Sequence, residues 1–349
     1  MTSRKNIQQI LVIKPSSLGD ILHVFPALQL LKNAYPEAQL DFLVNPEFAQ
    51  LLDFSPFPVR NKIIFQRKKM AAVKTALPEF FKLLRTLRKK HYDLVIDFQG
   101  LLRSAFFAGA ASCARGSVYG FASPREPLAR FFYDKCTITK TVHAVEKNVE
   151  LVKAITGQQA SVPSPQVPVA EQCQEFIRKL PDDFILLMPG ARWESKCFPV
   201  ELFSETAKKI AQAVPQANFI ISGSKAEIPA AEKLRRLLPA DFPVLDLTGK
   251  TTLHELFELI RHARALICND SGPMHISALL ATPVFAFFGP TDPDKTGPWG
   301  QRSNVFSTRV SCLGCMNRTC PEKEILCHQI DPAPVSSAVL QQVFNKETL

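Results

Sequence analysis

The chain has 349 residues, of which 46% are hydrophobic and 21% are charged, and its net charge at pH 7 is +10. These values suit a globular protein with substantial cores, more readily two domains than one. No apolar run approaches the roughly 18 residues of a membrane span, and the apolar run near the N-terminus is too short for a signal peptide. We therefore expect a cytoplasmic location and mostly reduced cysteines.

The first elements are a buried strand and a helix, with a carboxylate between them. Residues 10–13 are apolar and rich in branched side chains, as in a parallel strand buried on both faces. Apolar residues then recur at helical spacing from position 21 to position 31, so Asp20 falls in a first helical turn, which should lower its pKa. Asp20 is either a plain helix cap or a catalytic or binding group at the carboxyl end of a strand.

Most of the excess positive charge lies in one stretch. Between Arg60 and Lys90 there are eleven Lys or Arg and one acid, Glu79, so this stretch matches the whole excess of ten. Residues 78–90 read as an amphipathic helix with its bases facing out. The stretch is either a solvated surface or a landing surface for phospholipid headgroups, a phosphorylated glycolipid or nucleic acid. Nucleic acid fits least, because no aromatic residues interleave with the bases.

Strand-like runs alternate with helical patterns, which predicts an α/β fold with parallel sheets. The first half holds such runs at residues 10–13, 40–44, 62–65, 92–98 and 117–121. The second half holds them at residues 184–190, 218–224, 243–249, 265–270 and 283–289. A proline-rich linker at 161–170 divides the halves, so we predict domains 1–165 and 166–349. The last helical run, after residue 334, is assigned to the second domain, with packing back onto the N-terminal domain as the alternative.

Three familiar motifs are absent from the sequence. No G-x-G-x-x-G follows a strand, which argues against an NAD-type site. Residues 247–252 resemble a phosphate loop, but Val244 stands where that loop needs its upstream glycine. No G-x-S-x-G elbow is present, so the chemistry must come from other groups at strand ends.

Residues 187–199 bring two cations to the end of a predicted strand. The strand ends at Met188, and Arg192 and Lys196 follow before the next helix. Cations between a strand end and a helix start suit a polyanion such as a diphosphate. The alternative is that both are ordinary surface cations near a loop.

Residues 267–293 bring a second set of polar groups to a strand end. The strand stops at Asp270, Ser271 and Gly272 form a tight turn, and His275 lies at the start of a short helix. A hydroxyl, free amides and a helix N-terminus at one place form a phosphate-binding turn. His275 is either a phosphate donor or partner of Asp270, or a structural histidine.

Four of the nine cysteines cluster near the C-terminus. Cys312, Cys315, Cys320 and Cys327 follow the spacing C-x2-C-x4-C-x6-C. Clustered thiols in a cytosolic protein suggest zinc before a disulfide, although this spacing is not that of a standard finger. The alternatives are a structural zinc site and reduced thiols packed in a surface loop.

Five segments in chain order, "SSLGD", "IDFQGLLRSA", "PGARWESK", "NDSGPMHISAL" and "FGPTDP", together resemble the glycosyltransferase family 9 heptosyltransferases of lipopolysaccharide core synthesis. The resemblance implies a GT-B fold, two Rossmann-like domains facing across a cleft. It implies inverting transfer of heptose from ADP-L-glycero-D-manno-heptose to Kdo–lipid A or a heptosylated inner core, with no required active-site metal. The implied partners are this donor, a lipopolysaccharide precursor and the cytoplasmic face of the inner membrane, without nucleic acid.

The resemblance also assigns roles to individual residues. Asp20 matches the general base. The donor diphosphate is assigned to Lys196, Ser271, Gly272 and His275, and the donor nucleoside and sugar to Glu227 and Asp270. Arg192 departs from the family pattern, since some relatives have small hydroxyl residues before the lysine, and we expect it to replace part of their phosphate binding. For the acceptor we expect Ser17, Gln99 and Arg103 from the matching motifs and Arg60 and Arg67 from the basic stretch. The residues leave three alternatives open: another nucleotide-sugar transferase, a GT-B-type epimerase, or a non-catalytic module that binds nucleotide or anionic lipid.

Overall fold

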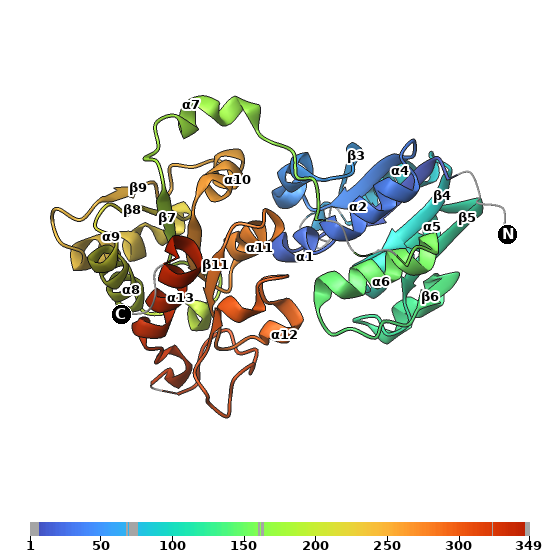
Figure 1. Ribbon diagram of the computed structural model, residues 1–349. Coiled ribbons are helices and arrows are strands. Elements are labelled where there is room, and N and C mark those ends of the chain that lie inside the picture. Colours follow the sequence, from blue (N-terminus) through green and yellow to red (C-terminus); the bar gives the residue numbers. More distant parts are fainter. Residues whose placement is uncertain are drawn as a thin grey trace. The chain divides into compact units, whose positions relative to one another are not determined.

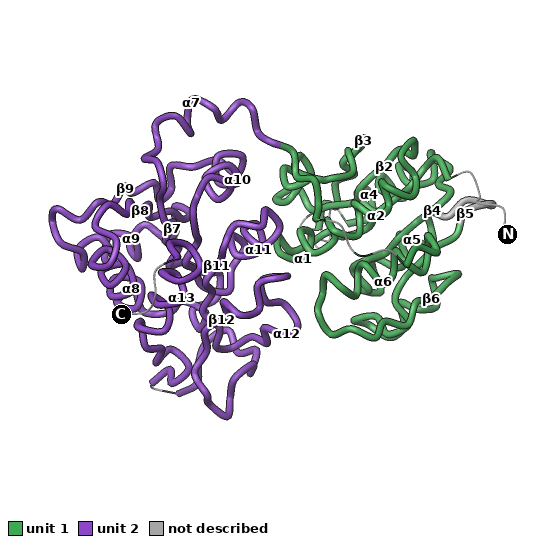
Figure 2. Tube along the Cα trace, viewed as in Figure 1, with its two compact units in different colours: residues 1–168 green, residues 169–349 purple. Residues whose placement is uncertain are grey.

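The structure, a computed structural model, describes residues 7–67, 69, 76–159, 161, 164–322 and 324–345, with the backbone alone at 112–116. The chain divides into two units, Met1–Pro168 and Val169–Leu349 (Figure 2). This division lies three residues beyond the predicted boundary at residue 165. The predicted linker spans the division, with residues 162 and 163 outside the described part.

Unit 1 contains a six-stranded parallel sheet in the order β3-β2-β1-β4-β5-β6 (Figure 1). Its strands are β1 Gln9–Ile13, β2 Gln39–Val44, β3 Val59–Ile64, β4 Tyr92–Asp97, β5 Ser112–Phe121 and β6 Lys135–Thr137. This is the doubly wound order, in which the chain leaves β1 to one side and returns to β4 on the other. The crevice beyond the carboxyl ends of β1 and β4 is therefore where such a sheet accepts a ligand.

The helices of unit 1 pack around this sheet. They are α1 Leu18–Leu22, α2 Phe25–Ala34, α4 Ala76–Arg88, α5 Leu102–Ala111 and α6 Ala144–Thr156, with 3-10 turns η1 Pro46–Phe54 and η2 Pro127–Phe132. Helices α4 and α5 share an apolar core with strands β1 to β5, and α2 packs against α6. The single helix predicted after Asp20 is interrupted at His23 and Val24, because Pro26 has no N–H to donate and its ring clashes with the carbonyl of Leu22.

Unit 2 repeats the same topology with a second parallel sheet, in the order β12-β11-β10-β7-β8-β9. Its strands are β7 Phe184–Met188, β8 Asn218–Ile221, β9 Val244–Asp246, β10 Ala265–Asn269, β11 Val284–Phe287 and β12 Val305–Phe306. Counted from β7, this is again the doubly wound order, so the switch point lies between β7 and β10. All ten strands predicted from apolar runs are present, whereas the short edge strands β6 and β12 were missed.

Seven α-helices are assigned in the described part of unit 2, with five short 3-10 turns. The helices are α7 Gln174–Ile177, α8 Val200–Ala213, α9 Ile228–Leu237, α10 Leu253–His262, α11 Gly272–Leu279, α12 Pro293–Thr296 and α13 Pro332–Phe344. The turns are η3 Glu171–Cys173, η4 Glu194–Lys196, η5 Lys225–Glu227, η6 Arg302–Asn304 and η7 Leu326–His328. In the part of the chain described, none of the helices combines the length and apolar character that crossing a membrane requires.

The last helix belongs to unit 2. Helix α13 packs against α8, and its Val335 and Val339 are fully buried in the core that also contains β7, β8, β10 and β11. Helix α13 is therefore part of the core of unit 2. Burial of these valines against α8 removes their apolar surface from water within unit 2 itself.

A buried carboxylate stabilises unit 1 near the amino ends of its strands. Asp41 on β2 is fully buried and accepts hydrogen bonds from Asn61 (2.7 Å), Lys90 (2.6 Å) and Tyr92 (2.8 Å), and Arg60 lies 3.3 Å away. Burial alone would raise the pKa of Asp41, but these donors lower it below its usual value. Asp41 therefore stabilises the folded state above its unfolded pKa, and this contribution is lost as pH falls through the folded pKa.

We predict that Asp41→Asn lowers the free energy of unfolding of unit 1 by about 1–3 kcal/mol at pH 7, because charged hydrogen bonds are replaced by neutral ones. The difference from wild type should shrink only as pH falls below about 4. Urea unfolding at several pH values measures it, with Asp53→Asn, at an exposed ion pair to Lys62, as the control. Equal stability of Asp41→Asn and wild type at pH 7 would contradict this.

Candidate functional site

The switch point of the unit 2 sheet gathers the polar residues predicted from the second half. The loop after β7 carries Arg192 and Lys196, the turn after β10 carries Asp270 and Ser271, and Glu227 follows β8. Because all strands of this sheet are parallel, their carboxyl ends meet at one edge. The sequence prediction that these segments share one edge is therefore supported by the topology.

Lys196 and Asp270 form an ion pair at this edge. Lys196 Nζ donates to Asp270 Oδ2 at 2.6 Å, and the hydroxyl of Thr291 donates to the same oxygen at 2.5 Å. The side chains of Lys196 and Asp270 are only 16% and 5% exposed, and the ammonium lies 4.6 Å from the ring centroid of Trp193. The ion pair and the indole hold a flexible side chain in one place, which suits a cation that must meet a phosphate.

Asn269 ties the two loops of the switch point together. This residue is fully buried at the end of β10, and its amide Nδ2 donates to the carbonyl of Pro189 at 2.5 Å. Its Oδ1 accepts a hydrogen bond from the backbone N–H of Phe198 at 3.4 Å. Asn269 thus fixes both ends of the Lys196 loop against β10.

The N-terminus of α11 follows Asp270 directly. Ser271 is the N-cap, with an extended backbone, and the helix begins at Gly272. The Ser271 hydroxyl is one of the few buried side-chain polar atoms, among the described residues, without a hydrogen-bond partner. His275 lies on the same helix and is half-buried. A buried, unsatisfied hydroxyl beside free helix amides suits an anionic ligand.

Glu227 lies against the turn that follows β7. A Cβ added at Gly190 would lie 1.9 Å from Glu227 Oε1, and one at Gly223 would lie 2.7 Å from Oε2. The carboxylate therefore occupies space that only glycine at both positions leaves free. It also accepts the Ser224 N–H at 2.5 Å, which fixes its orientation. Arg192, in the same turn as Gly190, is exposed.

In unit 1, Asp20 lies in the first turn of α1, beyond the end of β1. Its Oδ2 accepts the N–H of Ser17 at 3.0 Å and the Ser17 hydroxyl at 2.9 Å. Its Oδ1 accepts a hydrogen bond from Arg125 at 2.7 Å and lies 3.6 Å from Lys14 Nζ. Ser17, not Asp20, is the N-cap, and Asp20 at the third helical position completes a capping box by accepting the Ser17 N–H. A structural role through this oxygen and a functional role through the oxygen that faces the cations are both compatible with the structure.

These cations determine the charge state of Asp20. Burial alone would raise the pKa of Asp20, but Lys14 and Arg125, with the Ser17 amide, lower it below its usual value. The direction is the one expected from the sequence, and the largest contributions that lower this pKa come from the neighbouring cations Lys14 and Arg125. Burial in turn lowers the pKa of Lys14, whose ammonium also donates to the carbonyl of Phe98 at 3.0 Å.

The predicted acceptor residues fall into two groups. Ser17, Gln99 and Arg103 follow β1 and β4 at the switch point of unit 1, and the Gln99 side-chain oxygen is buried without a partner among the described residues. Arg60, in contrast, lies near the amino end of β3, where it contacts Asp41 and Gln9, so the structure does not bring it to this edge. Arg67 is exposed just beyond β3.

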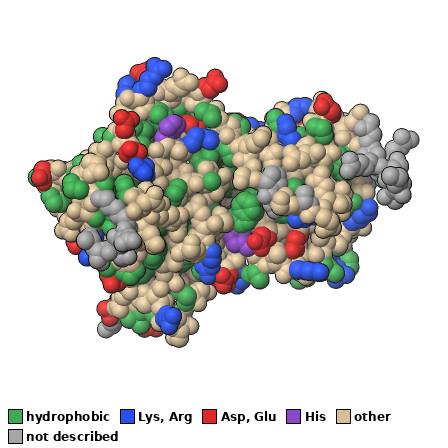
Figure 3. All heavy atoms as spheres, in the orientation of Figure 1, with side chains coloured by type: hydrophobic (Ala, Val, Ile, Leu, Met, Phe, Trp, Pro, Cys, Tyr) green, Lys and Arg blue, Asp and Glu red, His purple; other side chains and the backbone are tan. Residues whose placement is uncertain are grey.

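Helix α4 carries Lys82, Arg85 and Arg88 of the basic stretch. The predicted amphipathic pattern is present, because Leu83 and Leu87 are buried while the Lys and Arg residues face solvent. Leu77 and Phe81 are also exposed, by 67% and 61%. A groove of about 360 Å³ is lined by Phe81, Leu84, Arg85, Arg88 and Lys89. Lys68 and Lys74 of the basic stretch lie outside the described residues. On the face of the molecule drawn in Figure 3, basic and acidic side chains are interspersed.

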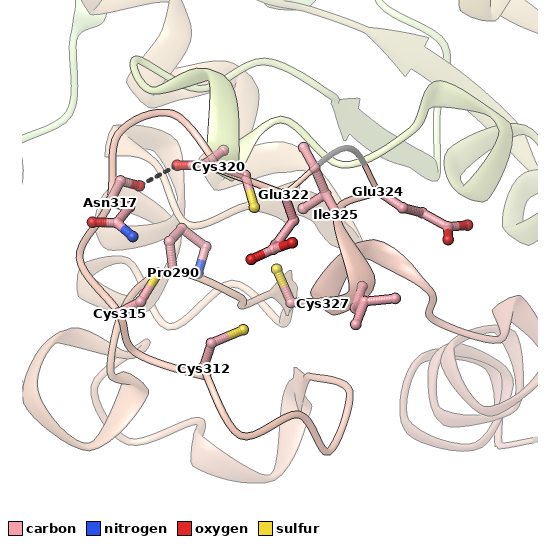
Figure 4. A pocket seen from close by; sticks show the side chains of 11 residues that line it. Pro290, Cys312, Cys315, Asn317, Cys320, Glu322, Glu324, Ile325 and Cys327 are labelled. Atoms are coloured by element: carbon pink, nitrogen blue, oxygen red, sulfur yellow. Dashed lines mark hydrogen bonds between the residues drawn. The ribbon is translucent and has the colours of Figure 1, made fainter.

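The four clustered cysteines line one small cavity of about 40 Å³ in unit 2. Cys312, Cys320 and Cys327 point into it together with the carboxylate of Glu322 (Figure 4). Within the described part of the chain, however, no three His, Cys, Asp or Glu side chains are grouped closely enough to hold a metal ion. The thiols fit a soft metal by chemistry, and the zinc site stays a prediction.

Sequence reasoning missed four residues of these two edges: Lys14, Arg125, Asn269 and Thr291. Lys14 and Asn269 directly border buried strands, so their position at a strand end was a usable signal. Arg125 is 105 residues from Asp20 and Thr291 is 21 residues from Asp270, and no local pattern links either pair.

Comparisons with known proteins agree with this picture. A family model described as glycosyltransferase family 9 (heptosyltransferase) matches residues 80–326. Lipopolysaccharide heptosyltransferase 1 of Pseudomonas aeruginosa is 29% identical over 89% of this chain and 87% of its own length, and that of Escherichia coli K12 is 30% identical over 85% and 92%. The solved E. coli heptosyltransferase WaaC with ADP-2-deoxy-2-fluoro heptose is 27% identical, with a TM-score of 0.69 over 87% of this chain and 94% of that one.

Fold and site together define a glycosyltransferase with the GT-B fold, as the sequence analysis expects. More narrowly, the chain belongs to glycosyltransferase family 9, the heptosyltransferase family, because the family model covers more than half of its length. The resemblance stated from five short motifs is thereby confirmed.

We predict that Arg125→Met raises the pKa of Asp20 toward its usual value, because one of the two cations that stabilise the ionised form is removed. Carbon-13 NMR titration of the Asp20 carboxyl measures this. Arg130→Met is a matched control, since Arg130 stacks on Phe131 instead. An unchanged titration of Asp20 in Arg125→Met would show that this ion pair does not set its charge.

Proposed function

We propose that this protein transfers heptose from ADP-L-glycero-D-manno-heptose to the inner core of lipopolysaccharide, with inversion at the anomeric carbon. The observation that carries the proposal is the Lys196–Asp270 pair beside the N-terminus of α11, at the switch point of the unit 2 sheet. Relatives named lipopolysaccharide heptosyltransferase, one of them solved with an ADP-fluoroheptose, support this donor and acceptor class.

The proposed role of unit 2 is to bind the donor and stabilise the departing ADP. Negative charge grows on the diphosphate as the glycosidic bond to heptose breaks, so fixed cations and amides there favour the transition state. Lys196, Arg192 and the Ser271 hydroxyl with the α11 amides are the groups we propose for this. Glu227, which lies against Gly190, is our candidate for accepting hydrogen bonds from the adenosine ribose.

The proposed role of Asp20 is general base for the acceptor hydroxyl. Its lowered pKa keeps it ionised at neutral pH, and its Oδ2 is oriented by Ser17. The same lowered pKa makes it a modest base, so we expect the proton to move late, when the anomeric carbon already carries positive charge. Ser17, Gln99 and Arg103 stay the candidates for acceptor contacts at that edge.

We further propose that the protein works in the cytoplasm at the inner face of the membrane. Helix α4 carries the exposed apolar side chains Leu77 and Phe81 together with exposed Lys and Arg residues. The bases suit anionic lipid headgroups, and the apolar side chains suit the apolar part of the membrane interface. The phosphates of a lipopolysaccharide precursor would meet the same charges.

We predict that Asp20→Asn lowers turnover at least about 100-fold, the usual scale for loss of a general base, and leaves ADP affinity unchanged. Mass spectrometry of truncated lipopolysaccharide acceptors incubated with ADP-heptose measures the product. Asp93→Asn is the matched control and should keep turnover. Asp93 accepts hydrogen bonds from two backbone N–H groups near the start of β1, whereas Asp20 follows the end of that strand.

Two results would contradict the proposal. Turnover with UDP-sugars and none with ADP-heptose would indicate another nucleotide-sugar transferase. A wild-type protein that binds lipid or nucleotide but modifies no acceptor would indicate a binding module.

The clustered thiols carry a separate proposal, a structural zinc ion held by Cys312, Cys315, Cys320 and Cys327. We predict about one zinc per chain in protein purified without chelator, and a lower zinc content in Cys327→Ser than in Cys136→Ser, a thiol in unit 1. Metal analysis of the purified protein measures this. Zinc-free wild-type protein with full activity would support reduced thiols instead.

A further inference from the structure

The cysteine segment, residues 312–328 with residue 323 outside the described part, is hydrogen-bonded to the loop that carries Lys196 and to the loop that carries Thr291, the second partner of Asp270. We infer that this segment positions the pair for the donor, and that Ser195 and His328 are the positioning residues through which it acts on Lys196. The inference rests on the proposed function, because it takes Lys196 as a ligand of the donor diphosphate.

Ser195 connects Lys196 to the cysteine segment. Ser195 is 3% exposed, and its backbone N–H donates to the carbonyl of Arg318 at 3.2 Å. Its hydroxyl donates to the carbonyl of Asn317 at 2.6 Å, the bond drawn as a dashed line in Figure 4. The residue that precedes Lys196 is therefore fixed by two bonds to a segment more than a hundred residues away.

His328 completes this connection from the other end of the segment. Its Nε2 lies 2.8 Å from the carbonyl oxygen of Ser195, and because a carbonyl can only accept, Nε2 carries the proton. Its ring also packs against Phe198, tilted by 34° with ring centroids 4.4 Å apart. The N–H, hydroxyl and carbonyl of Ser195 are thus all bonded to residues 317–328.

The same segment holds the loop that carries the second partner of Asp270. The N–H of Gly314 donates to the carbonyl of Gly289 at 2.9 Å, and the N–H of Met316 donates to the carbonyl of Pro290 at 2.7 Å. Thr291, the next residue, donates to the Asp270 carboxylate. Residues 314–318 are therefore bonded on one side to the Lys196 loop and on the other to the Thr291 loop.

The loop between β7 and α8 contains only the short turn η4, so little regular structure of its own fixes Lys196. A lysine left mobile must lose side-chain and loop entropy when it meets a phosphate, whereas a positioned one has already lost it. Loosening Ser195 should therefore weaken donor binding, in addition to any effect on stability.

The test measures ADP affinity by calorimetry and the KM values for donor and acceptor. We expect Ser195→Ala and His328→Ala to weaken ADP binding about 3- to 10-fold, the scale of one hydrogen bond, and to raise the donor KM with little change in acceptor KM. His328→Gln, which keeps an N–H donor, should restore most of the affinity. Ser204→Ala is the matched control, since this buried serine of α8 donates to the carbonyl of Leu237 on α9 and to none of these loops.

Lys196→Ala separates failure of the inference from failure of the proposed function. If Lys196→Ala binds ADP as wild type does, the donor site itself is wrongly assigned. If Lys196→Ala binds weakly but Ser195→Ala and His328→Ala match Ser204→Ala, the positioning role is overturned. Should the variants not fold, wild-type protein gives a second test: ADP should slow hydrogen exchange at the Gly314 and Met316 amides, and unchanged exchange there overturns the inference.

Discussion

In each unit the doubly wound sheet brings the carboxyl ends of all its parallel strands to one edge and leaves a switch point where consecutive strands diverge. In unit 1 this point lies between β1 and β4, and in unit 2 between β7 and β10. Asp20 follows β1 and Lys196 follows β7, so both central side chains owe their position to the same topological rule.

Charge pairing then distinguishes the two edges. In unit 1 a carboxylate is held by the cations of Lys14 and Arg125, and in unit 2 the cation of Lys196 is held by a carboxylate. Partly buried charges need such partners, because an unpaired charge away from water is costly. The partner of Lys196 reduces its pull on a phosphate but fixes its place, and the amides of α11 add attraction without a second cation.

Much of the fold could be predicted because each buried strand is a short apolar run that ends in a polar or glycine residue. Edge strands β6 and β12 have two or three residues and no buried apolar run, so periodicity cannot detect them. The break before α2 was readable in principle, since Pro26 forbids a continuous helix. The order of residues along one strand also matters: Arg60 sits in the basic stretch but near the wrong end of β3 for the switch point.

The candidate site could be predicted only where a polar or charged side chain follows a predicted strand in the same short segment, as at Lys196, Asp270 and Ser271. Contacts made across the fold were not: Arg125 reaches Asp20, Thr291 reaches Asp270, and the cysteine segment reaches Ser195. The cysteine spacing suggested a metal site. In the structure, the backbone around those cysteines makes most of the observed contacts with the loops that carry Lys196 and Thr291. Only the three-dimensional pairing of loops shows this second role.

All of this requires the carboxyl edge of the unit 2 sheet to bind a nucleoside diphosphate, which photo-crosslinking with 8-azido-ADP followed by peptide mapping can test. We expect label in the segments after β7, β8 and β10, around residues 189–196, 222–228 and 269–275, and loss of this label when unmodified ADP competes. Label confined to unit 1, or to loops at the amino ends of the unit 2 strands, would contradict it.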